Sequence, residues 1–258
     1  MSVSVFGRTV AWIAPLVLPA ITACATTQGG VRSAGGNDGL WVTYWRAVQD
    51  AAVIEPHEVS DHLDAVVPGT PGQVWREWPL GSGRQQVKVA TWAPGGFEVK
   101  VGELQNDRFT WVTLCPKVRD FCRDSGLTGN ALDMRLRQRL GLPPNDAKTR
   151  FIEYWVYPED LFRPAAVTSI DTTTVGPTAP RGYVNPHADM LLSQAEGSYT
   201  LPTPVGYPWT RLGYTYDWGY GGTGPEEEMG DSEFVIRSGC TIWVDSVTPT
   251  GEYGASGR

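Results

Sequence analysis

The chain has 258 residues, with 28 acidic against 21 basic side chains, a formal net charge of −7, 41% hydrophobic and 19% charged residues. These values exclude a disordered or collagen-like chain and a strongly basic nucleic-acid-binding protein. The 30 glycines, 20 prolines and 11 tryptophans predict many turns between aromatic-rich segments, which is typical of a compact domain that contains strands. One domain is the expectation for this length.

The N-terminal segment has the pattern of a secretion signal. Arg8 precedes residues 9–23, which are all apolar or small. This run contains two prolines and is shorter than the roughly 20 apolar residues of a membrane-spanning helix. It ends in Ile21-Thr22-Ala23-Cys24, which resembles the lipobox of bacterial lipoproteins. The resemblance implies cleavage before Cys24 and attachment of a palmitate-containing membrane anchor to it. The alternative is ordinary cleavage near Ala23, which leaves a soluble protein.

This pattern predicts three parts. They are a signal peptide over residues 1–23, an acylated Cys24 with a glycine-rich flexible tether over 24–39, and a single α+β domain over 40–258, with two lobes as the alternative. In enterobacterial lipoproteins an Asp after the acylated Cys favours the inner membrane, so Ala25 implies the outer membrane, facing the periplasm. Loss of the signal removes one arginine and no acid, so the mature chain has a net charge of −8. This charge favours neither nucleic acid nor an anionic lipid surface as a partner.

Hydrophobic periodicity predicts the elements of the first half of the domain. Val87, Val89 and Thr91 alternate with Lys88 and Ala90, which is typical of a strand with one buried face. The expected elements are a short strand over 40–43, helices over 44–53 and 59–66, and strands over 73–78, 86–92, 97–101 and 109–113.

The clearest predicted helix covers residues 130–140. Asn130 is its expected N-cap, and Leu132, Leu136 and Leu140 recur every fourth residue on one face. Its other face carries three arginines, which form either a solvated surface or an anion-binding ridge. The remaining elements are a central strand over 151–157, a helix over 186–196 and a hairpin of strands over 232–237 and 240–247. Together they predict an α+β fold, a mainly antiparallel sheet with several short helices.

Three cysteines follow Cys24 in the chain: Cys115, Cys122 and Cys240. Because the periplasm is oxidising, one disulfide and one leftover thiol are expected, and spacing alone does not decide between the three possible pairs. No C-x-x-C occurs and the three histidines are scattered, so no metal site and no cofactor are predicted.

The segment over 206–220 is the most distinctive part of the sequence, because six of its fifteen residues are aromatic. Two interpretations are open. The segment is either a platform on which a sugar ring, a peptide or a partner side chain stacks, or a loop that packs its rings onto the sheet with Arg211 and Asp217 paired. The candidate binding residues are Tyr207, Trp209, Arg211, Tyr214, Tyr216, Asp217, Trp218 and Glu233.

Two resemblances involve the second half of the chain. Residues 151–164, 207–218 and 232–236 are similar to stretches of a group of uncharacterised bacterial proteins, and this implies no activity or catalytic residue. In that group cysteines follow the Phe-Arg-Pro segment, whereas two alanines stand there in this chain. Arg46 and Asp231-Ser232-Glu233 loosely resemble the pattern of mono-ADP-ribosyltransferases, but Asp replaces the first Glu of the acidic pair and the Ser-rich strand is missing.

These observations favour a lipid-anchored envelope protein that binds or interacts over an enzyme, since no catalytic motif and no catalytic residue can be singled out. One concrete hypothesis is an immunity protein, an acidic domain that occludes a secreted toxin in the periplasm. A second is a module that binds cell-wall glycan through its aromatic segment. The enzyme alternative is an envelope hydrolase or transferase with carboxylates near Asp217 and Glu233.

Overall fold

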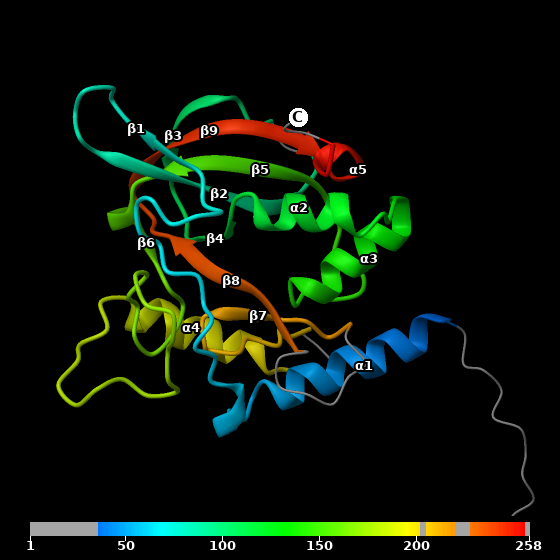
Figure 1. Cartoon of the computed structure of the whole chain (residues 1–258). Coiled ribbons are helices and arrows are strands. Elements are labelled where there is room, and N and C mark those ends of the chain that lie inside the picture. The colour runs from blue at the N-terminus through cyan, green and yellow to red at the C-terminus, as the bar shows by residue number, and fades with distance from the viewer. Residues whose placement is uncertain (1–35, 97, 202–204, 220–227, 256–258) are drawn as a thin grey trace, which may run out of the picture. The chain divides into compact units, whose positions relative to one another are not determined.

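An antiparallel sheet of nine strands organises the chain (Figure 1). The computed structural model describes residues 36–96, 98–201, 205–219 and 228–255. Within them the strand order is β3-β9-β5-β2-β4-β8-β6, with β1 paired to β2 and β7 paired to β8. The fold is therefore α+β, as the sequence predicts. The strands are β1 (Trp75–Glu77), β2 (Gln85–Pro94), β3 (Gly102–Asn106), β4 (Thr110–Leu114), β5 (Lys148–Val156), β6 (Leu161–Phe162), β7 (Tyr214–Tyr216), β8 (Met229–Ile236) and β9 (Cys240–Pro249).

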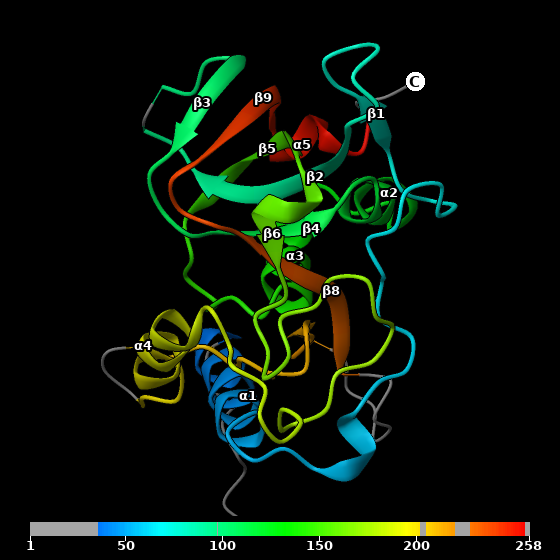
Figure 2. The ribbon, with the colours of Figure 1, turned by 90° about the vertical axis from the view of Figure 1, so that its left-hand side faces the viewer.

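Short helices cover parts of this sheet. Helices α2, α3 and α5 pack on one face of β2 and β5 through a cluster that includes Val118, Leu132 and Leu136. Helix α1 packs against β7 and helix α4 against β8, and both helices lie in the lower part of Figures 1 and 2. The described helices are α1 (Gly36–Asp50), α2 (Lys117–Asp124), α3 (Gly129–Arg139), α4 (Ala188–Ser198) and α5 (Thr250–Tyr253), with single 3₁₀ turns η1 (Pro56–Glu58) and η2 (Pro158–Asp160).

Alternation along β2 assigns its residues to the two faces of the sheet. Val87 and Val89 join an aliphatic cluster with Phe234 of β8 and Val244 of β9. Ala90 lies on the opposite face, in the cluster beneath α2, α3 and α5. β5 pairs with β2 on one side and β9 on the other, so it is the central strand that its two apolar faces predict.

Strand register places two carboxylates in one row across this second face. Glu153 of β5 is opposite Ala90 of β2, Ala90 is opposite Thr113 of β4, and Thr113 is opposite Glu233 of β8. Residues that face one another in antiparallel pairs point to the same side of the sheet. Glu153 and Glu233 are both buried in this row, and their surroundings differ in a way that defines the candidate site.

The expected strand over 40–43 is wrong, because α1 is helical from Gly36 to Asp50. Tyr44, Ala47, Val48 and Ala51 follow a helical period and pack together with Trp218, so this side contact stabilises a helix through the whole segment. α1 thus includes residues 36–39, which the sequence assigns to the tether, and the compact unit begins at Gly35. The other residues of the signal peptide, Cys24 and the tether lie outside the described residues.

The predicted hairpin of β8 and β9 is also wrong. Phe234, Ile236, Ile242 and Val244 do share a buried cluster, but β8 pairs with β4, β6 and β7 while β9 pairs with β3 and β5. The turn between them is held instead by Asn106, whose carbonyl accepts from the Gly239 N–H at 2.7 Å and whose side chain donates to the Arg237 carbonyl at 2.9 Å. Two strands that share a core on a curved sheet need not be neighbours in it.

Three smaller predictions need revision. Residues 59–66 are irregular apart from the nearby η1 turn, and the strand expected over 97–101 lies at 102–106 as β3. The helices expected over 130–140 and 186–196 are confirmed as α3 and α4, although the residue before α3 is Thr128, not the expected cap Asn130.

The expected disulfide is not formed, because Cys115, Cys122 and Cys240 are all free and buried. Cys115 and Cys122 belong to the cluster under α2, α3 and α5, whereas Cys240 lies in the aliphatic cluster on the opposite face of the sheet. Burial raises the pKa of all three thiols, to about 12 for Cys122, which keeps them protonated and unreactive. Among the described residues, no helix combines the length and the apolar character that crossing a membrane requires.

Candidate ligand-binding site

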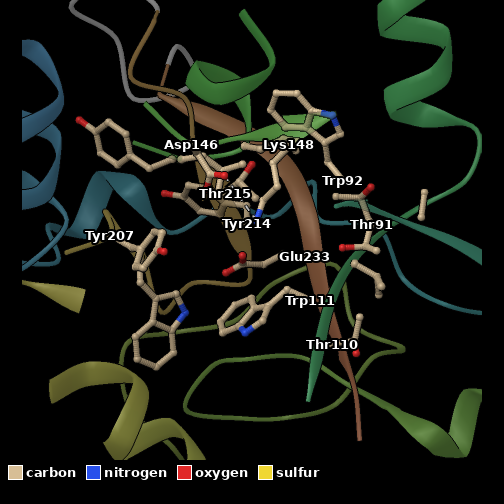
Figure 3. A pocket seen from close by; sticks show the side chains of 18 of the residues that line it. Thr91, Trp92, Thr110, Trp111, Asp146, Lys148, Tyr207, Tyr214, Thr215 and Glu233 are labelled. Atoms are coloured by element: carbon tan, nitrogen blue, oxygen red, sulfur yellow. Dashed lines mark ion pairs between the residues drawn. The ribbon is translucent and has the colours of Figure 1, made fainter. Parts of the chain in front are cut away.

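A pocket of about 420 Å³ opens on the second face of the sheet, between the part covered by α2, α3 and α5 and the part covered by α4 and the aromatic segment. Trp111 of β4, Glu233 of β8 and Tyr207 line it (Figure 3), and so do Thr113 and Trp209. The volume lies within the range of about 300–1,000 Å³ that is typical of small-molecule sites.

Glu233 is the most unusual group in this pocket. Its side chain extends from β8 toward the space between Tyr207 and Trp111 (Figure 3), and the residue is 7% exposed. Its Oε1 atom is buried and has no hydrogen-bond partner among the described residues. Burial raises the pKa of this carboxyl well above its usual range, and the positive charge of Arg163 offsets only part of that effect. A raised pKa favours the neutral form of this carboxyl, and in that form it can both donate and accept a hydrogen bond.

Glu153, in the same row of the sheet, has the opposite surroundings. Its carboxylate accepts hydrogen bonds from Tyr253 at 2.9 Å and Ser246 at 3.3 Å, pairs with Arg119, and lies 3.6 Å from the Lys88 ammonium. Buried carboxylates are normally satisfied in this manner. The comparison shows that burial in this row does not by itself leave a carboxyl without partners, so the lack of a partner for Glu233 Oε1 calls for an explanation.

A buried arginine fixes the position of Glu233. Arg163 is 0% exposed and has carbonyl acceptors in four residues, including Gly213 at 3.2 Å. The same Gly213 carbonyl accepts from the backbone N–H of Glu233 at 3.0 Å. Burial lowers the pKa of Arg163 to about 10, so it stays charged at neutral pH. Arg163 thus ties the Phe-Arg-Pro segment, the aromatic segment and β8 into one rigid unit.

Two indoles stand beside this carboxyl. Trp111 and Trp209 meet edge to face, with ring centroids 6.2 Å apart and an interplanar angle of 89°. The Trp209 carbonyl accepts from the Tyr199 hydroxyl at 2.7 Å, which fixes its backbone, while its buried Nε1 has no partner in the described part of the chain. Tyr207, 40% exposed, completes the wall toward solvent. The residues that line the pocket therefore include a buried donor and a buried carboxyl oxygen without partners in the described part of the chain, together with aromatic rings.

The other candidates of the aromatic segment hold the structure together. Tyr214 and Tyr216 border the pocket, but their hydroxyls donate to the Glu58 carbonyl and to Asp50 Oδ2, each at 2.9 Å. Trp218 packs edge to face on Tyr44 of α1 and donates to the Leu142 carbonyl at 3.0 Å. The packing interpretation thus holds for Tyr214, Tyr216 and Trp218, whereas Tyr207 and Trp209 line the pocket and their role as a binding platform stays a prediction.

The expected ion pair of Arg211 with Asp217 is not present. Arg211 adopts a positive φ of 61° and donates to the carbonyls of Ala51 and Ala52, at the end of α1. Asp217 instead forms a two-bond pair with Arg135 of α3, at 2.6 and 2.8 Å. Asp217 is not a lining residue of the pocket and is already neutralised, so it is no partner for Glu233 in acid–base chemistry.

The arginines of α3 are neither a solvated face nor an anion-binding ridge. Arg139 forms a second two-bond pair with Asp231 of β8, both bonds at 2.7 Å, and Arg137 donates to the Asp146 carbonyl at 2.8 Å. Arg46, the residue that the transferase resemblance requires, is exposed on α1 and does not line the pocket. With Asp231 paired and Arg46 elsewhere, the geometry lends no support to that resemblance.

Sequence reasoning missed several pocket residues. Trp111 looks like an ordinary strand residue, and Gln194 lies on a helix more than eighty positions away from it. Asp146 and Lys148, which form an ion pair at 3.5 Å in the pocket wall, come from the loop after α3 and the start of β5. Nothing in the local sequence marks these residues, because only the sheet register and the placement of α4 bring them together.

Three carboxylates gather elsewhere, at Asp50, Glu58 and Glu228, whose oxygens lie within 4.8 Å of one another. Burial, and secondarily the neighbouring Asp50, raises the pKa of Glu58 and Glu228. Exposed acidic groups of this kind are common, and we assign no ligand to them.

No family model, no curated protein and no solved structure matches this chain. The function must therefore be inferred from the geometry of the pocket itself.

Proposed function

We propose that this protein binds an uncharged, hydroxyl-rich ring, such as a sugar unit of cell-wall glycan, in the pocket beside Glu233. The observation that carries the proposal is the buried carboxyl oxygen without a partner, placed next to two indoles. A buried polar group without a partner costs about 1–3 kcal/mol, and a ligand that supplies the missing hydrogen bond recovers that cost.

A sugar fits the chemistry of this site. The apolar face of a pyranose packs on aromatic rings, and its hydroxyls meet the carboxylic acid of Glu233 and the indole N–H of Trp209. A neutral acid favours an uncharged ligand for two reasons. It offers no full charge with which an ionic ligand could pair, and an ion that entered the pocket would lose solvation by water. The hydroxyl groups of Thr113 and the amide of Gln194 add polar groups that can orient the ring.

The test is calorimetric titration of the full chain with N-acetylglucosamine and its short β-1,4-linked oligomers. Trp209→Phe keeps an aromatic ring and deletes only the N–H, so it should weaken binding by about 0.5–1.5 kcal/mol, roughly two- to tenfold in Kd. Glu233→Leu should weaken binding further, since it leaves a ligand hydroxyl unpaired against an apolar side chain. Glu233→Gln, which keeps one donor and one acceptor, should retain binding.

The matched control deletes an indole N–H that has a partner away from the pocket. Trp155→Phe serves this purpose in place of Trp218→Phe, because the Leu142 carbonyl that accepts from Trp218 belongs to a lining residue of the pocket. Trp155→Phe deletes an indole N–H that donates to Asp245, neither residue lines the pocket, and Kd should stay unchanged. The proposal is contradicted if none of the sugars binds, or if Trp209→Phe and Glu233→Leu bind as tightly as the wild type while remaining folded.

We also propose that the protein is a lipoprotein of the bacterial envelope, anchored through an acylated Cys24 and facing the periplasm. The support for this is the sequence Ile21-Thr22-Ala23-Cys24 after an apolar run, in a segment outside the described residues. Cys24→Ser should block palmitate labelling and release the protein from membranes. Unchanged labelling of the variant would refute the anchor.

The role as an immunity protein stays a prediction. Most of the acidic run over 226–228 lies outside the described residues, and Glu228 sits beside Asp50 and Glu58. The enzyme alternative loses Asp217 as a partner for Glu233, and we propose no catalytic step. A toxin partner would appear as a co-purifying protein whose capture is unaffected by Glu233→Leu.

A further inference from the structure

A second hollow of about 630 Å³ adjoins the first. Phe109, Trp111 and Gln194 line both, so the two form one continuous depression along β4 and the start of α4. We call the hollow whose lining includes Glu233 the inner part and the hollow along α4 the outer part, and Trp111 belongs to both.

The outer hollow differs in chemistry from the inner one. Its walls come from the start of α4 and the residues before it, including Pro186, His187, Asp189, Met190 and Ser193. Asp189 and Ser193 are exposed, so a group bound there would keep contact with water. The outer hollow thus resembles the polar rim of an interface, with some apolar surface. The inner hollow has in its lining the two buried polar atoms without partners, Glu233 Oε1 and Trp209 Nε1.

The floor of the outer hollow is rigid. The His187 ring stacks on Phe162 of β6, with centroids 3.7 Å apart and an interplanar angle of 17°, and the Phe109 ring meets it edge-on at 6.4 Å. The backbone N–H of His187 donates to Asn185 Oδ1 at 2.8 Å, which fixes the start of α4. A hollow built on stacked rings keeps its shape without a ligand, as a preorganised binding surface does.

We propose that the ligand is an oligosaccharide of at least two sugar units, which crosses Trp111 with one unit in the inner pocket and the next in the outer hollow. This inference rests on the proposed function and adds a length requirement to it. A single unit would occupy only the inner part and leave uncovered the residues that line the outer hollow alone, such as His187, Met190 and Ser193. Two linked units gain from both parts, because binding of the first holds the second at high effective concentration.

The experiment compares the affinity of the full chain for N-acetylglucosamine, its dimer and its tetramer. The wild type should bind the tetramer at least about tenfold more tightly than the monomer, beyond the about fourfold that four repeated units alone would give. Ser193→Trp fills the outer hollow and should reduce the preference for the tetramer to the about fourfold of repeated units while leaving monomer affinity unchanged.

Two variants make the outcome decisive. Leu192→Trp adds the same bulk at a neighbouring α4 position that is 65% exposed and does not line either hollow, so it should change neither affinity. Glu233→Leu should weaken monomer and tetramer by the same factor, because it acts on the inner unit only. A wild-type preference for the tetramer of no more than about fourfold, or a Ser193→Trp variant that keeps the wild-type preference, would overturn the two-unit inference and leave the inner site intact. Lack of binding at every length would remove the proposed function as well.

Discussion

The substitution Gly213→Ala tests the framework that positions Glu233. Gly213 has a φ of +82°, and a Cβ added there would lie 2.5 Å from Arg163 Cδ and 3.1 Å from Nη1. The left-handed backbone alone costs an Ala about 1–2 kcal/mol. Displacing the fully buried Arg163 adds an overpacking cost of about 1–3 kcal/mol, so the variant should lose about 2–5 kcal/mol of unfolding free energy in total.

Gly239→Ala supplies the matched control. Gly239 has the same φ of +82°, but no atom lies within 4 Å of the position its Cβ would take. This variant should lose only the backbone term of about 1–2 kcal/mol. The difference between the two variants, about 1–3 kcal/mol, then measures the contact with Arg163 alone.

The assay is urea unfolding of the full chain followed by tryptophan fluorescence. With similar m-values, the midpoints convert directly into the two free-energy losses. Equal losses for Gly213→Ala and Gly239→Ala would show that the Arg163 side chain does not pack against Gly213, and the link from Arg163 through Gly213 to Glu233 would be refuted. A larger loss for Gly213→Ala supports it.

Three further predictions concern buried charges and thiols. Because the folded-state pKa of Glu233 is raised, its contribution to stability is full below an unfolded pKa of about 4.3 and is lost as pH rises toward and through the folded pKa. The Glu233→Gln variant should therefore become more stable relative to the wild type as pH rises. Urea unfolding free energies of the two proteins that run parallel from about pH 4 to pH 8 would contradict this. Asp231→Asn leaves the half-buried Arg139 without its two-bond partner and should lower the unfolding free energy by about 3–5 kcal/mol in urea unfolding. The double variant with Arg139→Gln should recover part of that loss. Losses of the two single variants that add up in the double variant would mean that the pair is not coupled. The last prediction concerns the thiols of Cys115, Cys122 and Cys240 in a Cys24→Ser chain. A thiol reagent should label none of them in the native state and all three after unfolding. Labelling of a single thiol after unfolding would instead show the disulfide that is expected from the sequence.

Local patterns predicted those elements whose stability depends on their own periodicity. The alternation of Val87 and Val89 gives β2, and the fourfold spacing of Leu132 and Leu136 gives α3, because each pattern places one apolar face against a core. The α+β class follows from several such segments. Residues 40–43 were misassigned because their helical period continues into Tyr44 and becomes clear only against Trp218, which is far away in the sequence.

The sequence pattern does not show which distant segments pair with one another. The two-residue turn between β8 and β9 looks like a hairpin, yet the curvature of the sheet sends the strands to different neighbours. For the same reason the sequence identifies Tyr207, Trp209 and Glu233 as candidates but not Trp111, since its role depends on the register of β4 with β8. The sequence pattern also predicts that Arg211 pairs with Asp217, whereas in the structure Arg135 of α3 is the partner of Asp217.

The most direct test of the central claim is a titration of the full chain with the N-acetylglucosamine tetramer, followed through the indole N–H signals of the tryptophans in an NMR spectrum. The signals of Trp111 and Trp209, assigned by single Trp→Phe variants, should shift as the ligand occupies the pocket. The signals of Trp75 and Trp155, whose N–H groups donate to Gln73 and Asp245 away from the pocket, should stay in place. A titration in which the first pair does not move, or in which only the second pair moves, would contradict a glycan site beside Glu233.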